Sequence, residues 1–164
     1  MRAELTFDGG DLTPTELVNA LDDLEGSAGE HLETAAQEIA FEIEGDATEN
    51  APVGVSGNLQ SSLRSTVDSV GETLLEIHVG STANYAAAVE KGTDPHFPPP
   101  SALRDWARSV LGDEDLAYPV ARSIAENGTE AQPFLEPAFE DNLTFIVDRI
   151  NDAVEQAIQE ALFS

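Results

Sequence analysis

Apolar residues recur every three or four positions through the N-terminal part of the chain, and this pattern constrains the fold more than any other feature of the sequence. On an α-helix, that spacing lines the residues up along one face. Thr13, Pro14 and Glu16 predict the start of the helix as N-cap, first helical residue and capping-box partner. Pro52 predicts its end, because a proline biases the preceding residue away from helical conformation. A helix this long in a small domain has to pack against something extended or against another subunit. The apolar face consists of Leu17, Leu21, Leu24, Ala28, Leu32, Ala35, Ile39 and Ile43.

Shorter patterns predict the other elements. Alternating apolar residues indicate half-buried strands, and a Gly-Glu pair between two such runs indicates a hairpin turn. Gly92, Gly112 and Gly128 indicate helix ends, whereas a glycine pair inside the long helix leaves a bend there open. The proline loop at 95–100 has to run over the surface. The predicted elements are a strand at 2–8, a helical turn at 58–63, hairpin strands at 63–70 and 73–79, helices at 85–91, 101–111 and 115–127, and a closing helix from about Pro137.

These elements predict a single domain over residues 1–164 in the α+β class. A small antiparallel β-sheet would pack against two long helices, one near each terminus, with short helices connecting them. We expect Tyr85 and Trp106 in the core. In the later helices, the apolar pattern predicts one shared face of Leu103, Trp106, Ala107 and Val110, and inward positions at Tyr118, Ala121 or Arg122, and Ile124. In the closing helix it predicts one stripe of Phe139, Leu143, Ile146, Ile150, Val154, Ala157 or Ile158, and Leu162.

Charge is the other strong feature. The chain has 32 acidic residues against seven Lys and Arg, a net charge of -25 spread along its whole length. Like-charge repulsion on this scale weakens a compact state at low salt, but at molar salt the Debye length falls to about 3 Å. We therefore expect adaptation to a hypersaline interior, such as that of a haloarchaeal cell, with an acidic mesophilic protein as the alternative. So few scattered cations also argue against tight binding to nucleic-acid phosphates.

Catalytic and metal-binding patterns find no support in the sequence. There are no cysteines, no apolar run long enough for a bilayer and no signal-peptide pattern at the start. His31, His78 and His96 have no second histidine at metal-ligand spacing. We expect a soluble protein, intracellular when made, without enzymatic activity, cofactor or metal. One alternative of another class stays open, a metal-dependent hydrolase using Glu90, Asp94 and His96.

The end of the helix at 85–91 has an unusual charge pattern. Lys91, the single lysine, falls in the last turn, where a cation complements the helix dipole by about 0.3–1 kcal/mol. Glu90 falls in the same turn with the unfavourable sign. Either its carboxylate has an external donor or cation, or it is one more solvated acid. We expect Glu90 to hold a loop or a neighbouring subunit in place.

Three short motifs, in this order along the chain, carry a family resemblance. The first is an Ala-Pro-Val with a following Ser-Gly-x-Leu, the second a Tyr-Ala with a following Val-Glu-x-Gly-Thr, and the third a Pro-Phe-Leu with a following Pro-Ala. The sequence resembles the tail-completion, or neck, proteins of long-tailed phages and related archaeal viruses. The matching residues are Ala51, Pro52, Val53, Ser56, Gly57, Leu59 and Ser62, then Tyr85, Ala86, Val89, Glu90, Gly92 and Thr93, then Pro133, Phe134, Leu135, Pro137 and Ala138.

The chain departs from the family pattern at two places. Gly54 and Val55 separate Val53 from Ser56, one residue more than the pattern has, so the geometry of that loop is open. Lys91 stands at a variable position and is not part of the pattern.

The resemblance implies a structural virion protein at the head-tail interface, made in the host cytoplasm. Such proteins form a ring, usually of six copies, around the DNA channel, and contact neighbouring neck proteins and the tail tube or terminator. A tail-terminator or a head-closure protein of the same neck is the alternative. The net charge suggests an acidic lumen that lets DNA pass without specific binding, a hypothesis that a channel lined by Arg64, Arg104, Arg108 or Arg122 would contradict. The motif residues are implied to serve assembly and structure.

Overall fold

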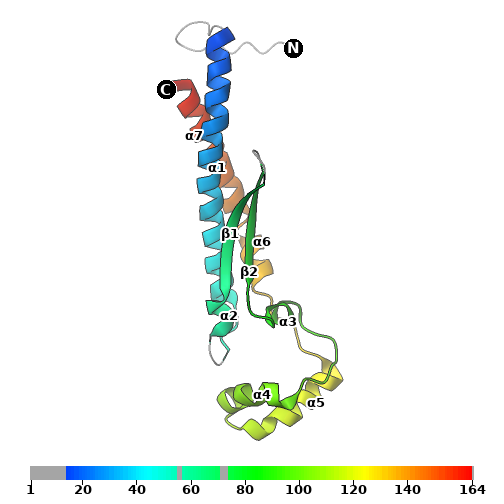
Figure 1. Ribbon diagram of the computed structural model, residues 1–164. Coiled ribbons are helices and arrows are strands. Elements are labelled where there is room, and N and C mark those ends of the chain that lie inside the picture. Colours follow the sequence, from blue (N-terminus) through cyan, green and yellow to red (C-terminus); the bar gives the residue numbers. More distant parts are fainter. Residues whose placement is uncertain (1–13, 55–56, 71–73, 164) are drawn as a thin grey trace.

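Helix α1 (Pro14–Asn50) runs along most of the molecule as one unbroken helix, and a hairpin and the C-terminal helices lie along it (Figure 1). The computed structural model describes residues 14–54, 57–70 and 74–163, with side chains described at 28–54, 57–69 and 75–161. The predicted strand at 2–8 and the Thr13 cap lie outside these residues. After α1 come α2 (Asn58–Ser61), β1 (Leu63–Val70), β2 (Leu74–Ser81), α3 (Ala86–Lys91), α4 (Pro100–Trp106), a π-helical turn η1 (Ala107–Leu111), a 3-10 turn η2 (Glu114–Leu116), α5 (Ala117–Asn127), α6 (Leu135–Asp141) and α7 (Leu143–Phe163).

Helix α7 packs antiparallel to α1, and three polar contacts record the register. His31 Nε2 lies 2.9 Å from Glu160 Oε2, Arg149 Nε donates to Glu38 at 2.6 Å, and Asn142 Nδ2 donates to Asp46 at 2.5 Å. Small buried residues allow the two helices to approach closely. The buried alanines of the two helices are Ala35, Ala36, Ala40 and Ala47 on α1 and Ala153 and Ala157 on α7.

The β-hairpin covers another face of α1. β1 and β2 pair antiparallel, with Ser65 opposite Val79 and Val67 opposite Ile77. The outer edge of β1 is tied to the helix, because Glu44 Oε2 accepts hydrogen bonds from the backbone N–H and the hydroxyl of Ser65, at 2.7 and 2.6 Å. Described residues form no further strand in this sheet.

Residues 94–128 form a separate projection, which we call the arm. Figure 1 shows α4 and α5 beyond the foot of α1, at the opposite end of the molecule from the C-terminus of α7. The chain leaves and re-enters the body side by side, where Thr93 and Thr129 form a β-bridge with hydrogen bonds of 3.1 Å in both directions. The arm is thus an insertion closed at its base.

The α+β class, the long first helix, the helical turn and the hairpin are confirmed. The closing helix differs from the prediction, because it is two helices that meet at Asn142, a buried residue that bonds Asp46 and the Ala138 carbonyl. The arm differs too, because it is too thin to bury large side chains on one face. Its buried residues are alanines, Ala107, Ala117 and Ala121.

Several residues predicted to be inward are therefore exposed. Trp106 is 38% and Tyr118 60% exposed, and Tyr85, expected in the core, is 43% exposed. In α7 the predicted stripe divides, because Ile146 and Ala157 lie toward the body while other members face outward. The exposed members of the predicted stripe are Phe139 on α6 and Leu143, Ile150, Val154 and Ile158 on α7.

Candidate functional site

Glu90 caps the N-terminus of α6 from the last turn of α3. One carboxylate oxygen, Oε2, accepts hydrogen bonds from the backbone N–H groups of Phe134 and Leu135 at 2.8 and 3.0 Å. The other, Oε1, accepts one from Glu136 at 3.0 Å. The first N–H groups of a helix have no partner within the helix and carry its positive dipole end, so an anionic acceptor there is favourable. The second sequence motif therefore holds the third in place.

The cap changes the acidity of Glu90. Partial burial by itself raises the pKa of the carboxyl, since it disfavours the charged form. The three backbone donors at Phe134, Leu135 and Glu136 and the nearby Lys91 ammonium outweigh burial, and the pKa of Glu90 lies below its ordinary value. The carboxylate is thus charged at neutral pH, and its unfavourable place at the end of α3 is explained by the helix that it caps.

Two glycines make room for the base of the arm. Gly92 has φ +68°, and a Cβ there would lie 2.5 Å from the Thr129 carbonyl oxygen. Gly128 has φ +73°, and a Cβ there would lie 2.0 Å from the Thr93 carbonyl oxygen. Both positions need the left-handed backbone that glycine adopts without strain, together with close backbone approach. The two Gly-Thr pairs, 92–93 and 128–129, therefore lie against each other at the base of the arm.

The three motifs meet in one hydrophobic core. Gly57, at φ +62°, precedes α2, and Gln60 Nε2 donates to the Thr48 and Ala51 carbonyls at 3.0 and 3.3 Å, which ties α2 to the end of α1. Phe134, from the third motif, is fully buried. Members of the core from the motifs are Ala51, Leu59, Ala86, Phe134 and Ala138, with Val89 and Leu135 packed against them.

The remaining motif residues lie near this core or on the surface. Pro52 and Pro137 are half-buried, and Pro133 is exposed. Thr93 pairs with Thr129 at the arm base, with 3.0 Å between the two hydroxyl oxygens. Ser56 lies outside the described residues, so the extra residue in the loop before it has no structural account.

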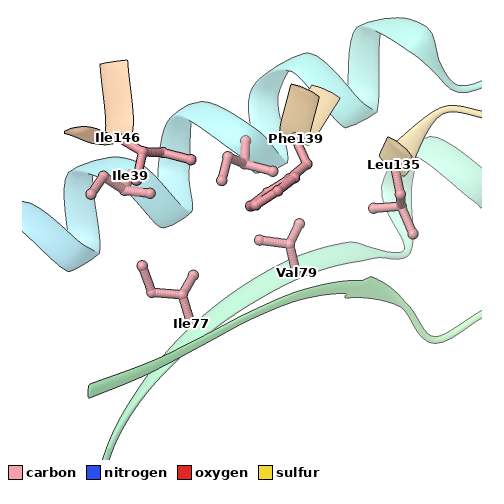
Figure 2. A pocket seen from close by; sticks show the side chains of 7 residues that line it. Ile39, Ile77, Val79, Leu135, Phe139 and Ile146 are labelled. Carbon is pink, nitrogen blue, oxygen red and sulfur yellow. The ribbon is translucent and has the colours of Figure 1, made fainter. Parts of the chain in front are cut away.

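An apolar groove lies between α1, the second hairpin strand and α6–α7. Figure 2 shows isoleucine and valine side chains of the strand and helices pointing toward one another across it, with the Phe139 ring lying among them. The groove has a volume of about 290 Å³, and its lining contains no polar side chain. Its lining residues are Ile39, Ile43, Ile77, Val79, Leu135, Phe139 and Ile146.

Helix α7 continues this apolar surface outward. Five of its residues, spaced three or four apart, share a face that no described residue covers, and we call this face the α7 stripe. Exposed apolar patches of this kind mark interaction sites more often than single exposed residues do. The α7 stripe consists of Leu143 (49% exposed), Val147 (55%), Ile150 (43%), Val154 (41%) and Ile158 (42%).

The hydrolase alternative loses its central residue. Glu90 is committed to the α6 cap through both oxygens. His96 Nδ1 lies 3.0 Å from the Asp94 carbonyl oxygen. Over the described ranges, no group of three or more His, Asp and Glu side chains could hold a metal ion. None of the described helices has the length and hydrophobicity that crossing a bilayer requires.

Sequence reasoning found Glu90 and Gly92 but missed the partners that explain them. Gly128 and Thr129 carry the other half of the arm base, and the repeated Gly-Thr pair was the available signal. The apolar spacing of the closing helix predicts a stripe but not its exposure, because a helical apolar pattern does not say whether another element of the same chain covers it.

Comparison with known families gives one match. Residues 15–92 match the model of the HK97-gp10-like family, described as "Bacteriophage HK97-gp10, putative tail-component". The match confirms the resemblance to phage tail proteins over α1, α2, the hairpin and α3, and it ends where the arm begins. Searches of curated proteins and of solved structures gave no match.

Proposed function

We propose that this chain, which over residues 15–92 matches a family of phage tail components, is a structural virion protein of the neck that completes the tail or joins it to the head connector. The observation that carries the proposal is the convergence of the three motifs in one core. At Glu90, the charged residue of these motifs, both carboxylate oxygens accept hydrogen bonds from the backbone at the start of α6. This supports a structural role for the motifs.

A ring of copies, most simply six, supports the neck role. The subunit is elongated, and it leaves the α7 stripe and the apolar groove uncovered over the described residues. Ring neighbours would cover such surfaces, because a heterologous interface between copies closes into a ring when the rotation allows. The 13 positions of the motif set (Pro52, Ser56, Gly57, Leu59, Tyr85, Val89, Glu90, Gly92, Thr93, Pro133, Phe134, Leu135 and Pro137) would then keep the subunit in the shape that the ring requires.

The charge of the chain supports two further parts of the proposal. A net charge of -25 would make a lumen lined by this protein repel DNA phosphates, so the genome would pass without specific binding. The same charge favours assembly in a hypersaline host cytoplasm, such as that of a haloarchaeal cell infected by a tailed virus.

The tail-terminator and the head-closure protein of the same neck are the second candidates. Both proteins would also form a ring between the connector and the tail tube. The family is described as a tail component, and a tail terminator is a protein of that kind. A virus that lacks the gene separates the three roles by the structures that accumulate.

Electron microscopy of lysates from a virus with this gene deleted tests the proposal. We expect filled heads and finished tails that stay unattached, and restoration of joined particles by the gene supplied in trans. Tails of uncontrolled length would point instead to a terminator, and heads that lose their DNA to a closure protein. Normal infectious virions, or absence of the protein from purified virions, would contradict every version of the proposal.

A further inference from the structure

The arm differs from the body in charge. Residues 94–128 contain three arginines and six acidic residues, a net charge of -3, whereas the other 129 residues carry -22. Arg104 makes no ion pair with any described residue, and Arg108 and Arg122 pair only with carboxylates of the arm itself. All three arginines are exposed. The arm is therefore less acidic, residue for residue, than the rest of this strongly acidic protein.

The arm also exposes large side chains of the kind that dominate protein interfaces. Tyr118 is 60% and Phe97 54% exposed, and their rings pack edge to face with centroids 6.3 Å apart. Trp106, the single tryptophan, is 38% exposed and lines a hollow between the arm and the body together with Pro52 and Val53. Tryptophan, tyrosine and arginine are the residues most enriched at binding hot spots. The arm thus has the composition of an interface without a partner among the described residues.

The α7 stripe has the complementary composition. Its members are aliphatic, and carboxylates run along one flank of it. Asp148 and Glu155 each follow a stripe residue by one position, which on a helix places both on the same flank. Neither makes an ion pair within the described chain, and both are exposed. An aliphatic strip with an acidic rim fits a partner that brings aromatic rings and arginines.

An arm cannot reach the α7 stripe of its own chain. The bridge between Thr93 and Thr129 and the close approach of Gly92 and Gly128 fix the base of the arm at the foot of the body. Figure 1 shows the arm pointing away from α7, whose C-terminal end lies at the other end of the molecule. The two surfaces can meet only between copies.

We propose that the arm of one copy binds the α7 stripe of the next, with arm arginines against the acidic rim. The partner is a second copy of this chain, because the arm supplies the cations and aromatic rings that the stripe and its rim lack. The contact is heterologous, so it leaves one free arm and one free stripe at the ends of any open chain of copies, and a closed ring satisfies both. This inference rests on the proposed ring of copies and names the surfaces that form it.

Two double variants and one control test the interface in molar KCl by size-exclusion chromatography with light scattering. The stripe variant is Val147→Glu with Ile150→Glu, and the arm variant is Trp106→Ala with Tyr118→Ala. Phe41→Glu is the control, because Phe41 is 76% exposed on α1 and belongs to neither surface. We expect the wild type and the control to assemble and each double variant to remain a 17.4 kDa monomer, with self-association at least about tenfold weaker. Unchanged far-UV circular dichroism would show that both variants are folded.

Mixing the two double variants gives the decisive result. The arm variant keeps its stripe and the stripe variant keeps its arm, so a mixture can form one intact contact and should give a 1:1 dimer that neither forms alone. Arg104→Glu should weaken assembly in the same direction, more at low salt than in molar KCl.

Several outcomes would overturn the proposal. Assembly of the arm variant as wild type would do so, and it is the result expected if stripe pairs with stripe. Assembly of the stripe variant as wild type, or a mixture of the two variants that stays monomeric, would also overturn it. A wild type that stays monomeric at high concentration would also refute it. These measurements use purified protein and test only the contact between copies. The proposed virion role is tested separately, by the phenotype of the gene deletion.

Discussion

At Glu90, one side chain joins two helices that lie far apart in the sequence. Its carboxylate accepts hydrogen bonds from three backbone N–H groups at the start of α6. Without Glu90, these donors would lack partners, because the first N–H groups of a helix have none within the helix. A carboxylate at the wrong end of its own helix is therefore a signature of a cap for another helix. The nearby Lys91 ammonium also lowers the pKa of Glu90, but Lys91 makes no ion pair within the described residues.

Replacing Glu90 with Gln should lower the free energy of unfolding at pH 7 by about 0.5–2 kcal/mol, the usual loss for a helix cap. The folded-state pKa of Glu90 is below its ordinary value, so the stabilisation is present above the unfolded pKa of about 4.3 and is lost as pH falls through the folded pKa. The difference between wild type and Glu90→Gln in urea melts should thus shrink below about pH 4. Weaker ring assembly should accompany it, because the cap also positions the base of the arm.

Glu130→Gln serves as the matched control for this prediction. Glu130 is exposed and has the same charge to lose, but its carboxylate accepts no hydrogen bond from any residue that the structure describes. Its stability should stay within about 0.5 kcal/mol of wild type. Equal stability of the Glu90 and Glu130 variants at pH 7 would count against the cap.

Gly128→Ala should destabilise the protein much more than Gly112→Ala, although both residues have positive φ. A Cβ at Gly112 meets nothing within 4 Å, so the cost there is the left-handed backbone alone, about 1–2 kcal/mol. At Gly128 the Cβ would in addition lie 2.0 Å from the Thr93 carbonyl oxygen. Trp106, the single tryptophan, sits in the arm and reports on it, so in Gly128→Ala its fluorescence should change at lower urea than the circular dichroism. Equal urea midpoints for Gly128→Ala and Gly112→Ala would show that the base of the arm is not close-packed.

At the scale of elements, α1 and α7 pack closely because alanines face the contact. Ala157 and Ala47 are fully buried, and Ala153 is 2% exposed. The ion pair between Arg149 and Glu38 lies near the surface and adds little to stability. The α1–α7 pair therefore depends on the small size of these side chains.

Ala157→Leu should lower stability by about 1–3 kcal/mol, since inserting methylene groups into a packed interface forces neighbours apart. Gln159→Leu, two positions along on the exposed side of α7, should change stability little. Thermal melts followed by circular dichroism would compare them. A similar melting temperature for both variants would mean that the two helices separate easily.

For the whole molecule, charge and shape act together. The net charge of -25 repels itself within the subunit and between copies, while the exposed stripe and the arm need close contact between copies. Salt decides the balance, because at molar concentration the repulsion is screened over about 3 Å, whereas hydrophobic contacts persist. Assembly and stability should therefore rise with salt together.

The melting temperature should increase as KCl is raised from low to molar concentration, and the assembled fraction should increase with it. Differential scanning calorimetry and light scattering on the same samples would measure both. An uncharged osmolyte at equal osmolality is the control, because it stabilises burial without screening charge. A melting temperature that is flat or falls with KCl would rule out charge repulsion as the limiting effect.

Local patterns predicted much of this fold. Helix α1, the hairpin and the end of α3 at Gly92 followed from periodicity, proline and glycine, since these signals act on neighbouring residues. The odd charge of Glu90 was visible as well, but its partners are more than forty positions away at Phe134 to Glu136, and no local rule connects them.

What the sequence determined alone is where helices and strands form and which of their faces are apolar, because backbone preference and side-chain spacing are local properties. What only the tertiary structure decided is which apolar faces are covered. Ile39 is buried and Ile150 is exposed, although both belong to long helical stripes of similar composition. A face is buried only if another part of the chain folds back over it. In this protein, residues 94–128 form an arm that projects away from the body, so they do not cover α7. The α7 stripe is left for a partner by that topology.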